Sequence, residues 1–203
     1  MTRQAFQDCI DSLHLVIDQI KESAHLLHDS VNQFYDKVHP YGLHLDMVAE
    51  ATCQYGHLVC ASERDVLPLI FGAYYHDAIE DARFSYNDTK KQARLYMDDE
   101  QALMAAEIVY AMTNEKGRTR AERANDRYYE GIRQTPYGPF VKLADRLANT
   151  DYSVSHGNES NRHMKAVYIA ELPHFLEAIN PHSNDPRFGV PQEMVDHINR
   201  LLQ

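Results

Sequence analysis

The chain reads VLPLIFGAYYHDAIED from Val66 to Asp81, where its most apolar run leads directly into a group of charged side chains. The apolar part ends at Tyr75 and is about half as long as the roughly 20 residues that a membrane-spanning helix needs. We therefore expect it to be buried in a protein core, next to the imidazole and carboxylates that follow. Burying such groups is costly unless something compensates their charge, and a bound cation is a natural compensator.

The same stretch is expected to form a helix over about 63–82. Residues four apart lie on one face of a helix, which pairs His76 with Glu80 and Asp77 with Asp81 on two adjacent faces. All four side chains would then converge on one wall of a pocket. One imidazole and its neighbouring carboxylate supply only part of a coordination shell, so further ligands are expected from other segments.

Two other segments offer such ligands. In PYGLH, which begins at Pro40, a loop delivers His44 to the start of a helix. In VKLADRLAN, which begins at Val141, Asp145 interrupts an apolar helical pattern, and Asn149 follows four residues later on the same face. A buried aspartate among valine, leucine and alanine again requires a counter-charge.

The spacing of apolar residues predicts helices along most of the chain. In the first helix, apolar residues recur at three- and four-residue steps from Phe6 to Leu27. No alternation of apolar and polar residues is long enough to predict a strand, and the stretch from Pro181 to Pro191 is expected to be a surface connection. The fold class is therefore all-α, a single-domain helical bundle spanning 1–203. The expected helices cover about 6–28, 31–38, 43–60, 63–82, 87–96, 100–114, 120–134, 141–152, 161–179 and 192–202.

Composition narrows the class of protein. With 203 residues, 44% of them apolar and 25% charged, the chain has the balance of an ordinary globular protein with one domain. The N-terminal residues do not resemble a signal peptide, so a cytoplasmic protein is expected. The net charge of −10 disfavours binding to nucleic acid or to an anionic membrane, and an anionic ligand would need a locally positive site or a metal. The three cysteines match no zinc or redox motif.

In order and spacing, His44, the pair His76-Asp77 and Asp145 resemble the metal-binding residues of the HD phosphohydrolases. More narrowly, His-Asp-x-x-Glu-Asp, preceded by Pro-Tyr-x-x-His and followed by Lys-Leu-Ala-Asp-Arg-Leu-x-Asn, resembles the hydrolase domain of RelA/SpoT-type (p)ppGpp hydrolases. The segment Thr113-Asn114-Glu115-Lys116 is similar to the Thr-Asp-Asp-Lys turn of that family. The resemblance covers about 35–180 and implies a helical domain of the HD type, with 1–30 as an extra N-terminal helix.

The resemblance implies a role for each matching residue. A divalent metal ion, expected to be Mn²⁺, would be bound by His44, His76, Asp77 and Asp145. Two imidazoles and two carboxylates, with positions left for water, suit such a hard-to-borderline ion. Glu80 and Asp81 would position and deprotonate the attacking water. Lys116 would bind the substrate phosphates, and Asn149 would contact the substrate sugar or the groups around the metal. Lys37 and Arg118, which the family motifs do not assign, are further residues expected to bind a nucleotide substrate.

Basic residues concentrated within 116–127 favour a wall that holds a polyanionic substrate, although their spacing also suits an exposed helix with surface ion pairs. Tyr41 and Tyr168 are further candidates for a pocket that holds a base, with core packing as the alternative. The basic residues are Lys116, Arg118, Arg120, Arg123 and Arg127.

One departure from the family leaves the substrate open. RelA/SpoT-type domains carry an Arg-Lys pair shortly ahead of the first His, which holds the guanine base. Here that stretch reads YDKVHP from Tyr35, with Lys37 as a partial substitute and no arginine. The leading hypothesis is a hydrolase of (p)ppGpp-like 3'-pyrophosphoryl esters. The alternatives are an HD phosphohydrolase acting on a nucleoside mono- or triphosphate or a cyclic nucleotide, a non-catalytic metal-dependent nucleotide sensor, and a purely structural helical module.

Overall fold

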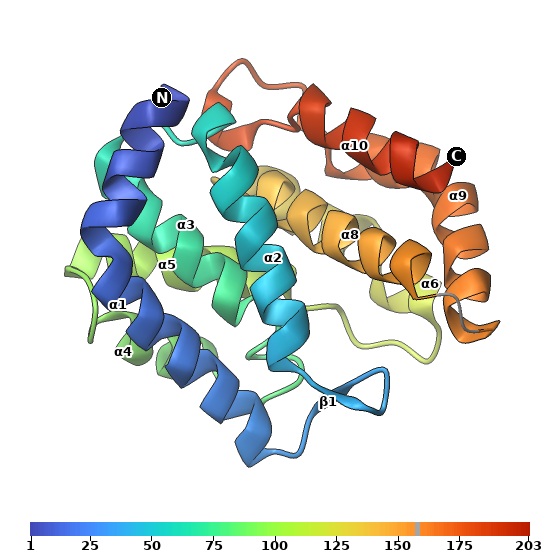
Figure 1. Cartoon of the computed structure of the whole chain (residues 1–203), viewed down its shortest axis with the longest axis horizontal. Helices are drawn as coiled ribbons and strands as arrows, with labels where there is room; N and C mark the ends of the chain where they lie inside the picture. The colour runs from blue at the N-terminus through green and yellow to red at the C-terminus, as the bar shows by residue number, and fades with distance from the viewer. Residues whose placement is uncertain (157–158) are drawn as a thin grey trace.

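The computed structural model describes residues 1–156 and 159–203, and at 120–121 the backbone alone. As the apolar spacing predicts, the chain is an all-α helical bundle, accompanied by one very small sheet (Figure 1). The helices are α1 (Arg3–Ser30), α2 (Gly42–Tyr55), α3 (Val66–Tyr75), α4 (Tyr86–Ala93), α5 (Asp99–Met112), α6 (Arg120–Arg123), α7 (Asp126–Gln134), α8 (Gly138–Ser155), α9 (Glu159–Ile179) and α10 (Gln192–Leu202). The strands are β1 (Phe34–Tyr35) and β2 (His39–Pro40), and short 3-10 helices cover Gly56–Leu58, Glu63–Asp65 and Pro186–Phe188.

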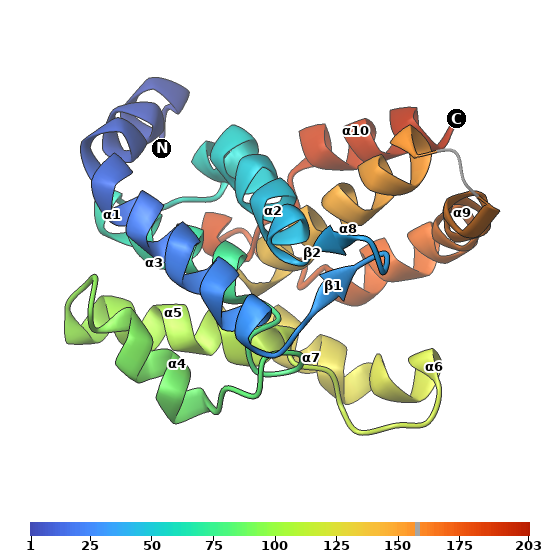
Figure 2. The ribbon, with the colours of Figure 1, turned by 60° about the horizontal axis from the view of Figure 1, so that its bottom comes forward.

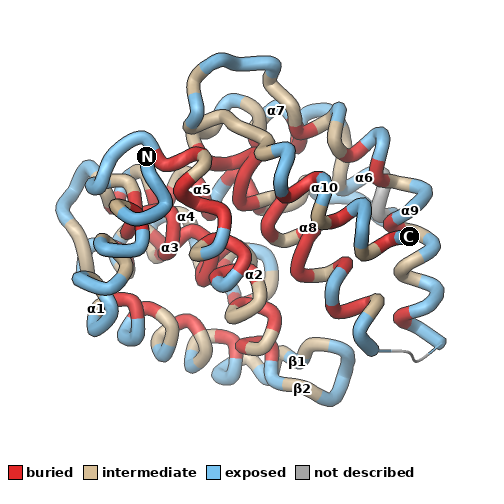
Figure 3. The backbone as a smooth tube through the Cα atoms, turned by 45° about the horizontal axis from the view of Figure 1, so that its top comes forward, coloured by how far each residue is buried: buried red, intermediate tan, exposed pale blue. Residues whose placement is uncertain are grey.

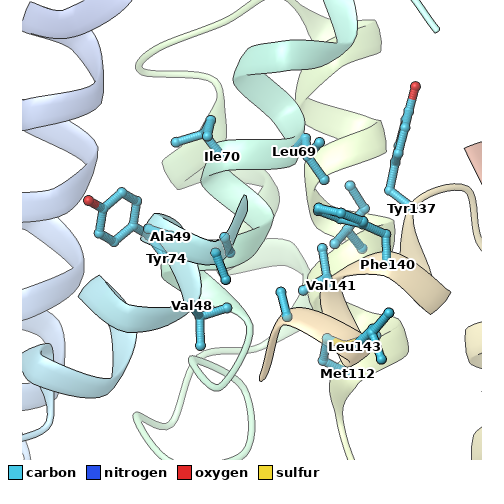
Figure 4. Packing of buried hydrophobic residues seen from close by; sticks show 14 of the residues in the cluster. Val48, Ala49, Leu69, Ile70, Tyr74, Met112, Tyr137, Phe140, Val141 and Leu143 are labelled. Carbon is cyan, nitrogen blue, oxygen red and sulfur yellow. The ribbon is translucent and has the colours of Figure 1, made fainter. Parts of the chain in front are cut away.

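Helix α3 lies in the interior of the bundle, and every one of its residues is buried. Helices α1, α2 and α5 pack against α3, and α4 packs against α5. Helix α8 packs against α2 and also contacts α9 and α10 (Figure 2). The buried residues therefore lie along the inner faces of these helices (Figure 3). Side chains of α2, α3 and α8, such as Val48, Leu69 and Val141, belong to one hydrophobic cluster (Figure 4). Within the described ranges, no helix is both long enough and apolar enough to span a bilayer.

The N-terminal helix α1 belongs to this same core. Thr2 caps it by accepting a hydrogen bond from the amide of Ala5, and one amphipathic face then packs on α3 and α2. At the other end of the chain, α10 packs on α8 through an apolar face of its own. The residues that α1 buries are Phe6, Ile17, Ile20, Ala24 and His28.

The prediction of a helix over 31–38 is wrong, and so is the expectation that the chain has no strand. Strands β1 and β2 pair antiparallel there, with Tyr35 opposite His39. Asp36 and Lys37 take positive φ angles of 50° and 71°, which a right-handed helix does not allow. Strands of two residues are too short to show an alternation of apolar and polar positions, so no local pattern predicts them.

The prediction of one helix over 63–82 is also wrong at its second half. Helix α3 ends at Tyr75, and the residues from His76 to Asp81 form turns. The amide of Ala78 bonds to the carbonyl of Tyr75, three residues back, and the ring of His76 bonds to the carbonyl of Ala73. The acidic residues after α3 are therefore presented by a turn and not by one helical face.

The other expected helices agree with the structure to within three residues at each end, with two exceptions. The helix expected over 43–60 ends at Tyr55 and continues as a 3-10 turn. The helix expected over 120–134 is divided into α6 and α7, because the side chain of Asn125 accepts a hydrogen bond from the amide of Tyr128 and begins α7.

Candidate metal centre

Three segments far apart in the sequence bring two imidazoles and a carboxylate together. His44 lies in the first turn of α2, His76 follows directly after α3, and Asp145 lies within α8. Each of the three offers one ligand atom, and these atoms all lie within 4.8 Å of one another. Nε2 of His44 is 3.2 Å from Nε2 of His76 and 3.4 Å from Oδ1 of Asp145. These residues can therefore hold a metal ion.

Asp77 lies beside this group. Its Oδ2 atom is 2.8 Å from Nε2 of His76 and 3.7 Å from Nε2 of His44. The hydroxyl of Tyr41 donates a hydrogen bond of 2.5 Å to the same oxygen. All four residues that the sequence predicts as metal ligands are thus brought to one place, with the two imidazole nitrogens and the carboxylate oxygens facing one another.

Neighbouring groups orient the individual ligands. Nδ1 of His76 lies 2.9 Å from the carbonyl oxygen of Ala73, which leaves Nε2 of the neutral ring as an acceptor directed at the other ligands. Asp145 accepts a hydrogen bond from Nζ of Lys142 at 2.9 Å and one from Nδ2 of Asn149 at 2.5 Å. As the sequence predicts, Asn149 lies on the same face of α8 as Asp145.

The charges at the centre match a site for a cation. Burial opposes protonation of His76, but the adjacent carboxylate of Asp77 outweighs burial and raises the pKa of His76 to about 9. The pKa of Asp77 is in turn lowered, because burial is outweighed by the imidazoles of His76 and His44. Burial likewise disfavours ionisation of Asp145, but Lys142 holds its pKa well below the usual range. Two ionised carboxylates and two imidazole nitrogens form a donor set that divalent transition-metal ions accept.

Glu80 and Asp81, the predicted catalytic carboxylates, lie next to these ligands on the wall of one cavity. Asn114 holds Glu80 by donating from Nδ2 to Oε1 at 2.9 Å and to Oε2 at 2.8 Å. Burial raises the pKa of Asp81 to about 6, and the nearby carboxylates of Asp77 and Glu80 add to this effect. The contact made by Asn114 was not expected, although this residue stands in the segment that resembles the Thr-Asp-Asp-Lys turn.

The cavity has a volume of about 850 Å³ and extends beyond the ligands to α7 and α9. Tyr41 and Tyr168 line it and also belong to the hydrophobic core. Arg146 pairs with Glu171 at 3.0 Å and places its guanidinium 4.6 Å from the ring centre of Tyr168. The lining residues that the sequence did not suggest include Tyr35, Tyr128, Tyr129, Lys142, Arg146, Glu171, His174 and Phe175. Lys142 and Arg146 could have been predicted as cavity residues from the sequence, because they stand three residues before and one residue after Asp145.

The structure does not bring the remaining predicted substrate-binding residues to the cavity. Lys37, Lys116 and Arg118 are exposed, and none of them is among its lining residues. Of the rest of the basic cluster, Arg123 lines the cavity, whereas Arg127 pairs with Glu115 at 3.4 Å. The side chain of Arg120 lies outside the described residues.

No protein-family model matches the chain, and no curated protein matches it. The geometry of the ligands, the adjacent carboxylates and the cavity is what bears on function.

Proposed function

We propose that this protein is a metal-dependent phosphohydrolase that acts on a nucleotide. The observation that carries the proposal is the convergence of two imidazoles and a carboxylate, with ligand atoms within 4.8 Å of one another, beside further carboxylates in a cavity of about 850 Å³. Concave sites with convergent polar groups of this kind are where binding and catalysis are found in proteins. The proposed ligands of the metal ion are His44, His76, Asp77 and Asp145.

The donor set favours a divalent ion such as Mn²⁺, which when bound would supply positive charge beside the phosphoryl oxygens and acidify a bound water. The protein's part is to hold the ligands in place. Tyr41 and Lys142 do this by donating hydrogen bonds to the carboxylates of Asp77 and Asp145, respectively. Because these carboxylates are already oriented, little rearrangement would be needed when an ion binds.

Glu80 and Asp81 are the proposed proton acceptors. Asn114 donates to both carboxylate oxygens of Glu80, which fixes that group at the cavity wall. Asp81 is half-buried, and no described basic side chain forms an ion pair with it within 4.0 Å. A carboxylate that is not paired with a cation remains available to accept a proton from a water molecule in the cavity.

The first substrate to test is ppGpp, because the sequence resembles (p)ppGpp hydrolases in four segments. The purified protein would be incubated with Mn²⁺ and ppGpp, and GDP and pyrophosphate would be measured. We expect turnover that is lost in Asp77→Asn and kept in the control Asp151→Asn, an exposed position on the same helix as Asp145. Wild-type protein that binds Mn²⁺ but hydrolyses no nucleotide would refute the proposed activity.

A different nucleotide is the second candidate, and the charge of the cavity favours it. Lys37, Lys116 and Arg118 lie away from the cavity lining. The acidic residues of that lining are Asp77, Glu80, Asp81, Asp126, Asp145 and Glu171, against the basic residues Arg123, Lys142 and Arg146. A cavity with this excess of acidic groups suits a ligand that carries fewer phosphates than ppGpp. The same assay with nucleoside mono- and triphosphates and cyclic nucleotides would separate the two candidates, and binding without turnover of any of them would indicate a sensor.

A further inference from the structure

Tyr35 connects two of the proposed metal ligands, although it is not itself a ligand. Its ring is nearly parallel to that of His44, with ring centres 5.1 Å apart and an angle of 12° between the planes. Its hydroxyl donates a hydrogen bond of 2.9 Å to Oδ1 of Asn149. One side chain of the β1–β2 hairpin therefore contacts both the first turn of α2 and the middle of α8.

The ring nitrogen of His44 that faces away from the other ligands has no hydrogen bond that would fix the ring. Among the described residues, its buried Nδ1 atom has no hydrogen-bond partner, whereas Nδ1 of His76 lies beside the carbonyl oxygen of Ala73. Metal-binding imidazoles are normally oriented through the ring nitrogen that does not bind the metal. The rings of Tyr41 and His76 approach His44 at steep angles, whereas the ring of Tyr35 lies parallel to it and restrains its plane.

Asn149 links the hydroxyl of Tyr35 to the carboxylate of Asp145 through hydrogen bonds. Nδ2 of Asn149 donates to Oδ1 of Asp145 at 2.5 Å and to the backbone carbonyl of Asp145 at 3.0 Å. Because these partners are acceptors, the Asn149 amide must turn its Oδ1 toward Tyr35, and that oxygen needs a donor there. The hydroxyl of Tyr35 is this donor.

The hairpin itself is held against α8. The hydroxyl of Tyr152 donates to the carboxylate of Asp36, and the ring of Tyr152 meets that of Tyr35 edge-on with centres 4.7 Å apart. Asp36 and the next residue, Lys37, are both in the left-handed region, which is unfavourable for a lysine. A backbone held in this conformation by tertiary contacts gives Tyr35 a fixed place over the ligands.

We propose that Tyr35 is a positioning residue for the metal centre, orienting His44 through its ring and Asp145 through Asn149. The inference rests on the proposed function only in taking His44 and Asp145 as metal ligands, and it concerns metal binding and not hydrolysis. It also assigns a role to the hairpin, whose sequence lacks the arginine of the family that the chain resembles.

The test separates the ring from the hydroxyl. Tyr35→Phe keeps the ring and removes the donor, so we expect its Mn²⁺ affinity, measured by calorimetry, to fall about 10-fold. Tyr35→Leu removes both contacts, and we expect a loss of about 100-fold. With Co²⁺ as a probe, the visible absorption spectrum of both variants should differ from that of the wild type, because the ligand geometry changes. The control is Tyr110→Phe, an exposed tyrosine that does not line the cavity.

A double-mutant cycle checks the path through Asn149. If the hydroxyl acts by way of Asn149, Tyr35→Phe should cost little further affinity in an Asn149→Ala background. Wild-type affinity and an unchanged Co²⁺ spectrum in Tyr35→Phe would overturn the proposal, even if Tyr35→Leu fails to fold. Metal binding without hydrolysis in the wild type would refute only the proposed function, whereas a wild type that binds no metal would refute both.

Discussion

Nε2 of His44 and Nε2 of His76 face each other at 3.2 Å in the interior of the protein. Two neutral rings cannot both direct a lone pair at the other without repulsion, so either a proton or a cation has to lie between them. In the absence of a metal, the neighbouring Asp77 favours the proton and raises the pKa of His76 to about 9. A divalent ion at the centre would take the place of this proton.

Metal binding should therefore stabilise the folded protein. An ion that binds only the folded state at 100 times its Kd raises the free energy of unfolding by about 2.7 kcal/mol. We expect urea unfolding to show an increase of this size with Mn²⁺, and chelation with EDTA to reverse it. His76→Gln should lose the increase, whereas the exposed-site variant Asp151→Asn should keep it. Equal unfolding midpoints for the wild type with Mn²⁺ and with EDTA would contradict the metal centre.

The pair formed by Lys142 and Asp145 should be costly to break. Both side chains are mostly buried, and their charged atoms lie 2.9 Å apart. Lys142→Met leaves a buried carboxylate without its partner, which costs about 3 kcal/mol in the free energy of unfolding. We expect a smaller loss when Mn²⁺ is present, because the ion compensates Asp145. Arg94→Met, which breaks the exposed pair with Asp99, should cost less than about 1 kcal/mol under both conditions.

Much of this fold could be predicted from local patterns in the sequence. Apolar spacing placed α10 at its observed bounds and located most of α8, including the shared face of Asp145 and Asn149. Charged groups within apolar segments need a compensating partner, which pointed to the imidazole and carboxylates after α3 and to Asp145, whereas the full set of four proposed ligands came from the resemblance to HD phosphohydrolases. These features depend on residues that are close together in the sequence.

What the sequence did not predict depends on contacts between distant segments. The hairpin forms where a helix was expected because Tyr35 and Asp36 find their partners on α8, more than a hundred residues later. Lys116 was predicted to bind substrate from its place in the segment that resembles the Thr-Asp-Asp-Lys turn, and Arg118 from its place in the basic cluster. The exposure of both depends on how the segment between α5 and α7 packs on the rest of the fold. Nothing in their local sequence reports that packing.

A buried histidine should make the stability of the protein depend on pH. His28 is fully buried, neither of its ring nitrogens has a hydrogen-bond partner among the described residues, and burial lowers its pKa from 6.5 to about 4. Between these values the unfolded state binds more protons than the folded state, so the free energy of unfolding falls as the pH falls. This loss of stability from His28 is absent above pH 6.5, and below that pH it grows by at most about 1.4 kcal/mol per pH unit.

His28→Phe removes this group while keeping a ring that can stack on Tyr41. Urea unfolding at pH 7 and pH 5 would give the loss of stability for each protein. We expect the variant to lose about 2 kcal/mol less than the wild type on acidification, whatever its stability at pH 7. The other titrating groups are common to both proteins, so an equal loss in both would show that His28 is protonated in the folded state.

The close packing of α3 against α5 should make Gly72 intolerant of a side chain. A Cβ atom at Gly72 would lie 2.6 Å from Cγ2 of Ile108, which is fully buried in α5 and has little room to move. Gly72→Ala should therefore cost about 1–3 kcal/mol in the free energy of unfolding through overpacking. Gly131 in α7 provides the matched control, because a Cβ atom there would meet nothing within 4 Å. Gly131→Ala should stabilise the protein by about 0.5–1 kcal/mol, since alanine favours a helix more than glycine does. If Gly72→Ala were also stabilising, α3 and α5 would have to be further apart than the structure places them. The double variant Gly72→Ala/Ile108→Leu, which removes the Cγ2 methyl group that the new Cβ atom would meet, should then show no recovery of stability.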